Sequence, residues 1–184
     1  MGTDAQSTIT WPSAVKSDSS TGTIAYATAN PITFITCNNE SHDWYYTGSE
    51  STDNTRWTTS DKAKSIYDPC PPGWRVSDGG HNGVWSKALG SSSYFYHTYS
   101  SFSEGMNFSG KFGSEQTIWY PASGYRYGRD GSLYYVGDYG CYWSTSPYSN
   151  DACLLGFSYG GDVDPEIRSY RASGLSVRCL RVID

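Results

Sequence analysis

Aromatic side chains must supply much of the core of this chain, because the usual apolar residues are scarce. Leu, Ile, Val and Phe together number 27 of the 184 residues. A fraction that low indicates disorder only beside a high net charge. Here the net charge is −5, and seven Trp and 17 Tyr help to bring the aromatic share to 16%. Each buried ring removes a large apolar area from water. The composition therefore predicts a folded domain and excludes a disordered tail or a coiled coil.

The distribution of apolar and basic residues excludes further classes of protein. No apolar run approaches the ~18 residues that a membrane-spanning helix needs. A pI near 5.1 and the lack of a basic block argue against a general nucleic-acid-binding protein. Residues 1–8 lack the basic and apolar regions of a secretory signal. We therefore expect the parent protein to be longer, with any localisation signal outside this sequence.

Turn and strand signals divide the chain into a short polar segment and one domain. Residues 1–29 are predicted to be a linker or an N-terminal extension, and residues 30–184 the domain. A short helix is predicted over 84–89, and Gly90 is expected to end it. Alternating or β-branched stretches predict strands over 32–36, 141–146, 152–157 and 174–182. Residues 68–76 are predicted to be a stiff turn that leads into a short strand, and residues 117–125 a strand and a turn. Long helices and repeats are absent, and residues 91–117 are predicted to be irregular loop.

The five cysteines carry no metal or redox signature. None forms a CxxC pair, and none has zinc-finger spacing with a histidine. Cys70 occupies a Pro-rich turn and Cys179 an apolar terminal strand, which are the two most structural settings. Two alternatives stay open for this pair: a disulfide, if the compartment is oxidising, or two buried free thiols.

The strongest signal is the uneven composition of residues 125–173. This tract has no Lys, Gln or Met and is rich in Tyr, Ser, Gly, Asp, Arg and Cys. All five Lys precede residue 112, whereas six Arg follow residue 124. Tyr offers a large rigid contact area, Ser, Gly and Asn offer adaptable hydrogen bonds, and Arg offers charged anchors. The tract therefore favours a binding surface. The alternative is that Tyr and Ser merely cover a β-rich surface.

The signatures of common enzymes are missing from the sequence. It contains no G-x-S-x-G, G-x-G-x-x-G, Walker A or H-E-x-x-H motif. The histidines are scattered through loop-like sequence and are predicted to be surface or loop residues: His42, His81 and His97. Asp162, Asp164 and Glu166 are a candidate Ca²⁺ loop, but their spacing differs from an EF-hand and favours a solvated acidic turn. We therefore expect no catalytic residue, no cofactor and no metal.

Four segments of the chain resemble one family of bacterial surface proteins. They are DPCPPGWRV at 68–76, YWSTS at 142–146, LGF at 155–157 and RASGLSVRC at 171–179. Over roughly residues 30–184, the chain resembles the Fibrobacter succinogenes major paralogous domain family. The first and last segments, in that order and ~100 residues apart, are the most specific part of the resemblance.

The uneven tract also resembles the variable region of proteins diversified by diversity-generating retroelements. In such systems the adenines of a template are copied with errors, and Asn codons are favoured targets. Those codons yield Tyr, Ser, Asp, Gly, Cys, Arg and several apolar residues, but not Lys, Gln, Met, Trp or Glu. Trp143 and Glu166 are exceptions in this tract that fit fixed framework positions. The resemblance implies that Cys141 and Cys153 are accidents of diversification.

The resemblance implies a C-type-lectin-like fold of the α+β class, with short helices, small antiparallel sheets and much irregular loop. The core of that frame would include Trp74, Trp119, Trp143, Leu175 and Val177. The diversified side chains would gather on one exposed face and bind the ligand. The ligand-binding residues so implied are Tyr127, Arg129, Tyr134, Tyr135, Asp138, Tyr139, Cys141, Tyr148, Asp151, Cys153, Tyr159, Arg168, Ser169 and Tyr170.

These expectations describe a non-enzymatic receptor-binding module on a bacterial cell surface, at the tip of an adhesin, pilus or lipoprotein, or on a phage tail fibre. Its partner would be an unknown protein or glycan receptor, with no nucleic acid and no direct membrane insertion. The calcium motifs of sugar-binding C-type lectins, Glu-Pro-Asn and Trp-Asn-Asp, are absent from the sequence. Two alternatives remain. One is an enzyme similar to formylglycine-generating enzymes, with Cys141 or Cys153 as its thiol, and the other is a structural pilus or surface subunit.

Overall fold

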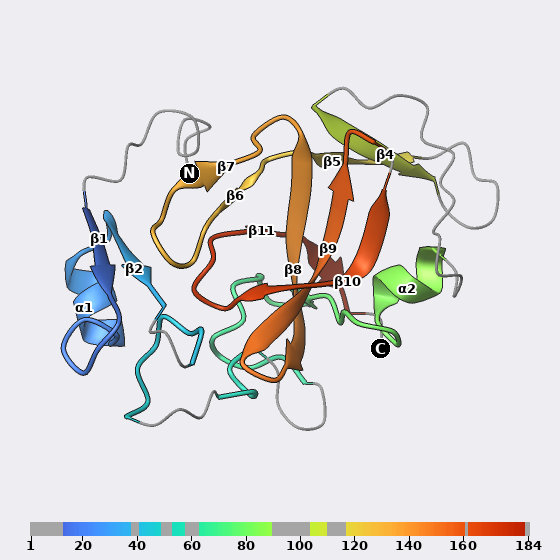
Figure 1. The fold of residues 1–184 in the computed structure, drawn as a ribbon. Coiled ribbons are helices and arrows are strands. Elements are labelled where there is room, and N and C mark those ends of the chain that lie inside the picture. Colours follow the sequence, from blue (N-terminus) through green and yellow to red (C-terminus); the bar gives the residue numbers. More distant parts are fainter. Residues whose placement is uncertain are drawn as a thin grey trace.

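A four-stranded sheet forms the centre of the computed structural model (Figure 1). The structure describes residues 13–37, 41–48, 53–57, 63–89, 104–109, 117–160 and 162–182. The strands of the central sheet are β8 (Tyr139–Tyr148), β9 (Asp151–Ser158), β10 (Val163–Tyr170) and β11 (Ser176–Val177). Their order is β10-β9-β8-β11. The sheet is antiparallel except that β11 runs parallel to β8.

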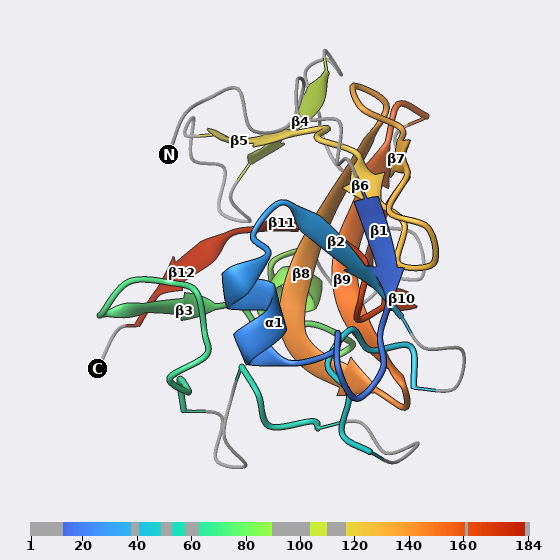
Figure 2. The same cartoon turned by 90° about the vertical axis from the view of Figure 1, so that its left-hand side faces the viewer.

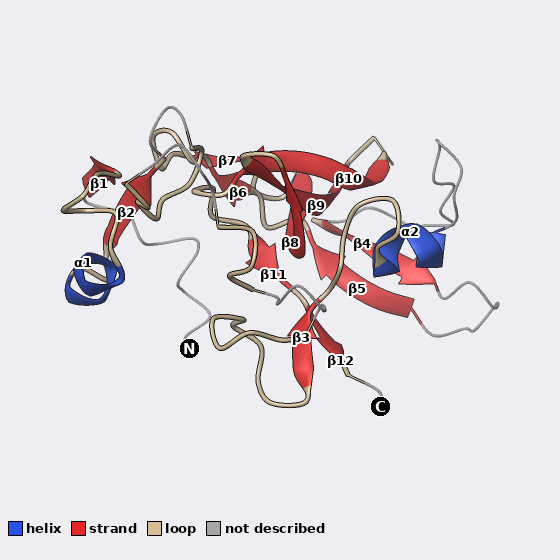
Figure 3. Cartoon of the chain, turned by 90° about the horizontal axis from the view of Figure 1, so that it is seen from below, coloured by secondary structure: helices blue, strands red, loops and turns tan. Residues whose placement is uncertain are grey.

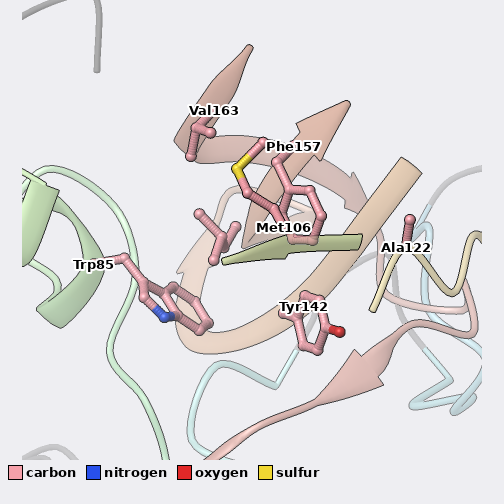
Figure 4. Packing of buried hydrophobic residues seen from close by; sticks show 7 residues of the cluster. Trp85, Met106, Ala122, Tyr142, Phe157 and Val163 are labelled. Atoms are coloured by element: carbon pink, nitrogen blue, oxygen red, sulfur yellow. The ribbon is translucent and has the colours of Figure 1, made fainter. Parts of the chain in front are cut away.

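Both faces of the central sheet are covered, so successive residues in the middle of β8 and β9 are all buried. Successive side chains of a strand point to opposite faces. The first core cluster comprises Trp85, Met106, Ala122, Tyr142, Leu155, Phe157 and Val163 (Figure 4). The second cluster comprises Cys141, Trp143 and Leu154, with Trp57, Tyr125, Tyr139, Ala152, Ile167 and Leu175 packed against it. Tyr142 and Trp143, although adjacent in β8, therefore serve two different clusters.

A strand–helix–strand unit lies to one side of the central sheet (Figures 1 and 2). In it β1 (Ser13–Lys16) pairs in parallel with β2 (Thr33–Thr36), and α1 (Ile24–Ala29) connects them. The side chain of Thr23 accepts a hydrogen bond from the backbone N–H of Tyr26 and so caps α1. Residues 13–29 therefore contain a strand and a helix, which the expected linker or N-terminal extension did not specify. The Ser/Thr-rich sequence gives no local signal for β1, because this strand is defined by its main-chain pairing with β2.

The turn at the start of the 68–76 motif is organised by one buried carboxylate. Asp68 accepts hydrogen bonds from the backbone N–H groups of Cys70 (2.8 Å) and Val76 (2.9 Å). Lys64 donates to the same carboxylate at 2.7 Å. A buried carboxylate needs such partners, because an unpaired charge is costly to remove from water. The conformation of this motif therefore depends on Asp68.

Two segments that lie far apart in the sequence are joined beside this turn. β3 (Trp74–Val76) pairs antiparallel with β12 (Cys179–Arg181). A disulfide links Cys70 to Cys179, with their Cα atoms 5.7 Å apart. Of the two alternatives that the sequence left open, the structure has the disulfide. The other three cysteines are free and buried: Cys37, Cys141 and Cys153.

Short elements surround this frame. α2 (Val84–Leu89) has the bounds that the sequence predicts, and its Trp85 enters the first cluster. β4 (Gly105–Ser109) pairs with β5 (Thr117–Pro121), so part of the loop predicted over 91–117 is strand. Residues 90–103 and 110–116 lie outside the described residues. β6 (Tyr125–Arg126) and β7 (Leu133–Tyr134) form a small hairpin.

Small sheets, mostly antiparallel, and irregular loop dominate the described part of the chain, and the helices there are short (Figure 3). This agrees with the α+β class expected from the sequence. Within the same residues, no helix has the length and apolar character needed to cross a membrane.

Three of the predicted core residues are exposed. Trp74 is 41% exposed, Trp119 39% and Val177 37%, whereas Trp143 is 6% exposed. Leu175 is half-buried against the second cluster. Trp74 and Trp119 belong to two-stranded sheets, which do not enclose them on both faces as the central sheet encloses Trp143. The single last strand predicted over 174–182 is also wrong, because β11 and β12 join different sheets.

Candidate ligand-binding surface

The β6–β7 hairpin is fixed to the central sheet by its backbone. Gly124 donates to the carbonyl of Tyr139 at 2.8 Å, and Arg126 and Gly174 exchange two backbone hydrogen bonds of 2.8 and 2.9 Å. Gly124 has a φ of 63°, and a Cβ placed there would collide with the carbonyl oxygen of Tyr134. Glycine alone fits this close approach. The hairpin therefore presents its tyrosines from a rigid base.

Six tyrosines on this hairpin and on neighbouring strands form one continuous network of ring contacts. We call them the tyrosine surface: Tyr125, Tyr127, Tyr134, Tyr135, Tyr139 and Tyr170. The ring centroids of contacting pairs lie between 5.9 and 6.3 Å apart. These separations are typical of favourable aromatic pairs. The network runs from Tyr139, at the start of β8, to Tyr170, at the end of β10.

Charged groups close the Tyr170 end of the network. Arg129 donates to the hydroxyl of Tyr170 at 2.8 Å, and its guanidinium carbon lies 5.0 Å from the centre of that ring. The ring of His42 lies 4.2 Å from the ring of Tyr170, and its Nδ1 is 2.8 Å from Oδ1 of Asp151. The hydrogen bond to Tyr170 raises the pKa of Arg129 further above neutrality. Arg129 is therefore a permanent cation on the exposed side of this end.

His42 is a member of this site that the sequence analysis missed. We predicted an ordinary surface or loop histidine, since it lies in a polar loop far upstream of the tract at 125–173. Nothing in its local sequence points to the tyrosines. The fold brings His42 next to Tyr170. The backbone N–H of Ala172 donates to the His42 carbonyl at 3.1 Å and so holds the two segments together.

Most residues of the predicted contact set reach the surface. Those that are exposed are Arg129, Tyr134, Tyr135, Asp138, Tyr148, Tyr159 and Arg168. Those that are half-buried are Tyr127, Tyr139, Asp151, Ser169 and Tyr170. Tyr159 lies at the Tyr139 end, where its backbone N–H donates to the carbonyl of Asp138 at 3.1 Å. Ser169 bonds to the hydroxyl of Ser173 at 3.1 Å. Arg168 and Tyr148 form a pair of their own, with the guanidinium 3.4 Å from the ring centre.

Cys141 and Cys153 are wrong as contact residues, because they are only 4% and 5% exposed. Both lie in the part of β8 and β9 that is covered on both faces, so their side chains enter the interior. Burial raises the pKa of Cys141 to about 12 and also raises that of Cys153. A reactive thiol requires the opposite, a lowered pKa. Their surroundings therefore give no support to a cysteine nucleophile.

The acidic residues at 162–166 do not form the solvated turn that the sequence favours, because Asp164 and Glu166 lie in β10, and they offer no recognisable cation site. Glu166 pairs with His81 at 3.3 Å, and Asp164 accepts from the backbone N–H of Glu166 at 2.7 Å. Across the described ranges, no group of three or more His, Cys, Asp and Glu side chains is placed to hold a metal ion.

Two residues of this region adopt a backbone conformation that side chains normally avoid. Tyr135 has a φ of 56° and His42 a φ of 55°. In the left-handed region a non-glycine residue is uncommon, and a bulky one is a genuine outlier. Such strain persists only where the surrounding structure imposes it, and it clusters at functional sites. The fold thus holds the Tyr135 ring in place against a local preference.

Comparisons with protein-family models, with curated proteins and with solved structures find no match to this chain.

Proposed function

We propose that this chain is a non-enzymatic ligand-binding module that uses the tyrosine surface, together with Arg129, as its contact face. The observation that carries the proposal is the unbroken ring network from Tyr139 to Tyr170. Tyrosine combines a large apolar ring with a polar tip and loses few rotamers on binding, which suits recognition of varied partners. The partner is a protein or glycan receptor.

The proposal includes a C-type-lectin-like scaffold and a diversified face, as in variable proteins of diversity-generating retroelements. Its support is that the tract at 125–173 supplies both buried core residues and exposed tyrosines. The interior of the first cluster takes Tyr142, Leu155 and Phe157 from this tract, while Tyr134 and Tyr135 stay exposed. A face of this kind accepts new side chains without loss of the frame. Display on a bacterial surface structure or a phage tail fibre fits this role.

The binding proposal is tested with two defined probe sets, an array of purified glycans and a displayed random-peptide library. We expect selected binders that lose at least about tenfold in affinity, roughly 1.4 kcal/mol, when Tyr134 and Tyr135 are both changed to Ala. The melting temperature should stay within about 4 °C of wild type, as for a change below about 1 kcal/mol. Tyr67→Ala is the matched control, because Tyr67 is 51% exposed outside the tyrosine surface. Equal losses in both variants would refute the assignment of the contact face.

Diversification is tested separately, in the nucleotide sequence around the gene. We expect a nearly identical template repeat that differs from the segment encoding 125–173 only at its adenines. Differences spread over all four bases would refute this part of the proposal and leave the binding test unaffected.

A further inference from the structure

A pocket of about 100 Å³ lies away from the six tyrosines, beside the later half of β8. Residues from four separate segments line it: 43–44, 53–57, 143–152 and Arg171. Three of the lining residues are tryptophans, and an indole has a flat apolar face. The lining also holds carboxyl, amide and guanidinium groups, so the pocket is amphipathic and suits a ligand with both an apolar face and hydrogen-bonding edges.

One polar group of the lining is a buried carboxyl group without an ion pair. Asp43 is 6% exposed, and its Oδ1 accepts from the backbone N–H of Tyr45 at 3.1 Å. None of the ion pairs among the described residues includes Asp43. Burial raises the pKa of Asp43, while the charges of Arg171 and Arg56 oppose that rise. A backbone hydrogen bond from Trp44 also opposes that rise. An ionised carboxylate has about four lone-pair sites, so Asp43 can accept a further hydrogen bond from a ligand hydroxyl.

A second polar group is short of an acceptor. Nε of Arg56 is buried and has no hydrogen-bond acceptor within the described part of the chain. Elsewhere on this guanidinium, Nη2 lies 3.3 Å from Oδ2 of Asp53, and the guanidinium carbon lies 3.9 Å from the centre of the Tyr45 ring. A buried donor left unpaired costs free energy that a ligand oxygen would recover.

The charges of the pocket argue for a neutral ligand. Two carboxyl groups, Asp43 and Asp53, face two guanidinium groups, Arg56 and Arg171. Arg171 is already committed, because it donates to the carbonyls of Asp151, Asp53 and Ser149 and to Oδ1 of Asn54. Neither a cation nor an anion would find an excess of opposite charge here. A hydroxyl, by contrast, both donates and accepts.

We propose that this pocket binds one ring of a neutral sugar, with an apolar ring face against an indole and hydroxyls that donate to Asp43 and accept from Nε of Arg56. The volume is well below the ~300 Å³ of drug-sized sites, so the pocket takes part of a single ring and leaves the rest in solvent. The inference goes beyond the function proposed for the tyrosine surface and does not depend on it.

The experiment titrates the full chain with methyl glycosides of glucose, galactose, mannose and N-acetylglucosamine, and follows tryptophan fluorescence and protein NMR shifts. We expect at least one to bind with a Kd on the order of 1–10 mM, which is typical of so small a contact. Asp43→Asn removes the charged acceptor, and Arg56→Lys keeps the positive charge but removes the Nε–H donor. Each should weaken binding at least about fivefold.

Matched controls separate this site from the tyrosine surface. Asp138→Asn and Tyr134→Ala change exposed residues outside the pocket lining and should leave the glycoside titration unchanged. The inference is overturned if no methyl glycoside shifts the signals up to about 100 mM, a concentration that would detect very weak binding. It is also overturned if both pocket variants bind as wild type does, or if tetramethylammonium or acetate binds in place of the glycosides. The wild-type titration decides the matter even where a variant fails to fold.

Discussion

His42 and Asp151 lie 109 residues apart in the sequence, yet their side chains meet at 2.8 Å. The contact fastens the loop at 41–48 to the first residue of β9. The ring of His42 also packs against Tyr170, so the same contact braces one end of the tyrosine surface. A loop outside the tract at 125–173 therefore helps to fix the shape of the proposed binding face.

This relationship is measured by a double-mutant cycle of His42→Ala and Asp151→Ala. Both side chains are partly exposed, at 26% and 28%, so solvent screens their interaction. We expect a coupling of about 0.2–1 kcal/mol in the free energy of unfolding, determined by urea titration. Strictly additive single changes would show that the two side chains do not stabilise each other.

The strained backbone at Tyr135 predicts an unusual response to glycine. A left-handed conformation costs an ordinary residue roughly 1–2 kcal/mol, which Tyr135→Gly would relieve. Glycine adds unfolded-chain entropy of about 1 kcal/mol, so the two backbone effects nearly cancel and the loss of the ring contacts of Tyr135 remains. The matched variant Tyr134→Gly, in β7 and without positive φ, gains no such relief and should lose about 1 kcal/mol more. Equal losses in urea titrations would contradict the strain.

The disulfide closes a long segment of chain and should contribute much of the stability. Cys70 and Cys179 are 109 residues apart. Changing both to Ala should lower the free energy of unfolding by about 2–5 kcal/mol, because the unfolded chain regains freedom. Wild type in reductant should approach the variant, while the variant itself should not respond to reductant. A wild-type unfolding midpoint that does not change on reduction would contradict this account.

Asp43 predicts a dependence of stability on pH. Its pKa is raised in the fold, so the folded state holds the proton more tightly than the unfolded chain does. This carboxyl group therefore lowers stability as pH rises from its ordinary pKa of 3.8 through the raised folded value. The variant Asp43→Asn keeps an acceptor for the N–H of Tyr45 and does not ionise. As pH rises through the raised pKa, its free energy of unfolding should increase relative to that of wild type, and at neutral pH it should be at least as stable. A difference that runs the other way would show that the ionised form is favoured.

Gly140 makes room for the first core cluster. A Cβ there would collide with the ring of Phe157, which is 0% exposed. Gly140→Ala should therefore cost about 1–3 kcal/mol through overpacking, as seen in thermal or urea unfolding. Gly160→Ala is the control, since its nearest atoms lie 3.8 Å away and its effect should stay within about 0.5 kcal/mol. If Gly140→Ala left the free energy of unfolding unchanged, the first cluster would have to rearrange readily around the added methyl group.

Sequence patterns identified elements where one local signal dominated. The bounds of α2 were predicted at both ends, and the strand predicted over 152–157 differs from β9 by one residue at each end. β10 was missed, because Pro165 and a register shift between Asp164 and Ile167 break its alternation. β1 was missed because its pairing with β2 depends on main-chain hydrogen bonds that a Ser/Thr-rich sequence does not reveal.

The composition of the tract at 125–173 singled out five of the six residues of the tyrosine surface, all but Tyr125, and could not separate outward from inward positions. Cys141 and Cys153 share the tract with Tyr134 and Tyr135, and only the two-sided cover of the central sheet assigns the cysteines to the interior. His42 could not be found at all, because its role depends on contacts between distant segments.

The tyrosine surface has an inner and an outer row, with a consequence for engineering. Tyr125 and Tyr139 pack against the second cluster, and burial raises the pKa of Tyr139 to about 12. Tyr134, Tyr135 and Arg129 have no place in either cluster. A combinatorial library on this scaffold should therefore randomise the outer positions and keep Tyr125 and Tyr139. Changes at the inner pair would disturb the core, so they would lower the number of further substitutions that the fold can accept.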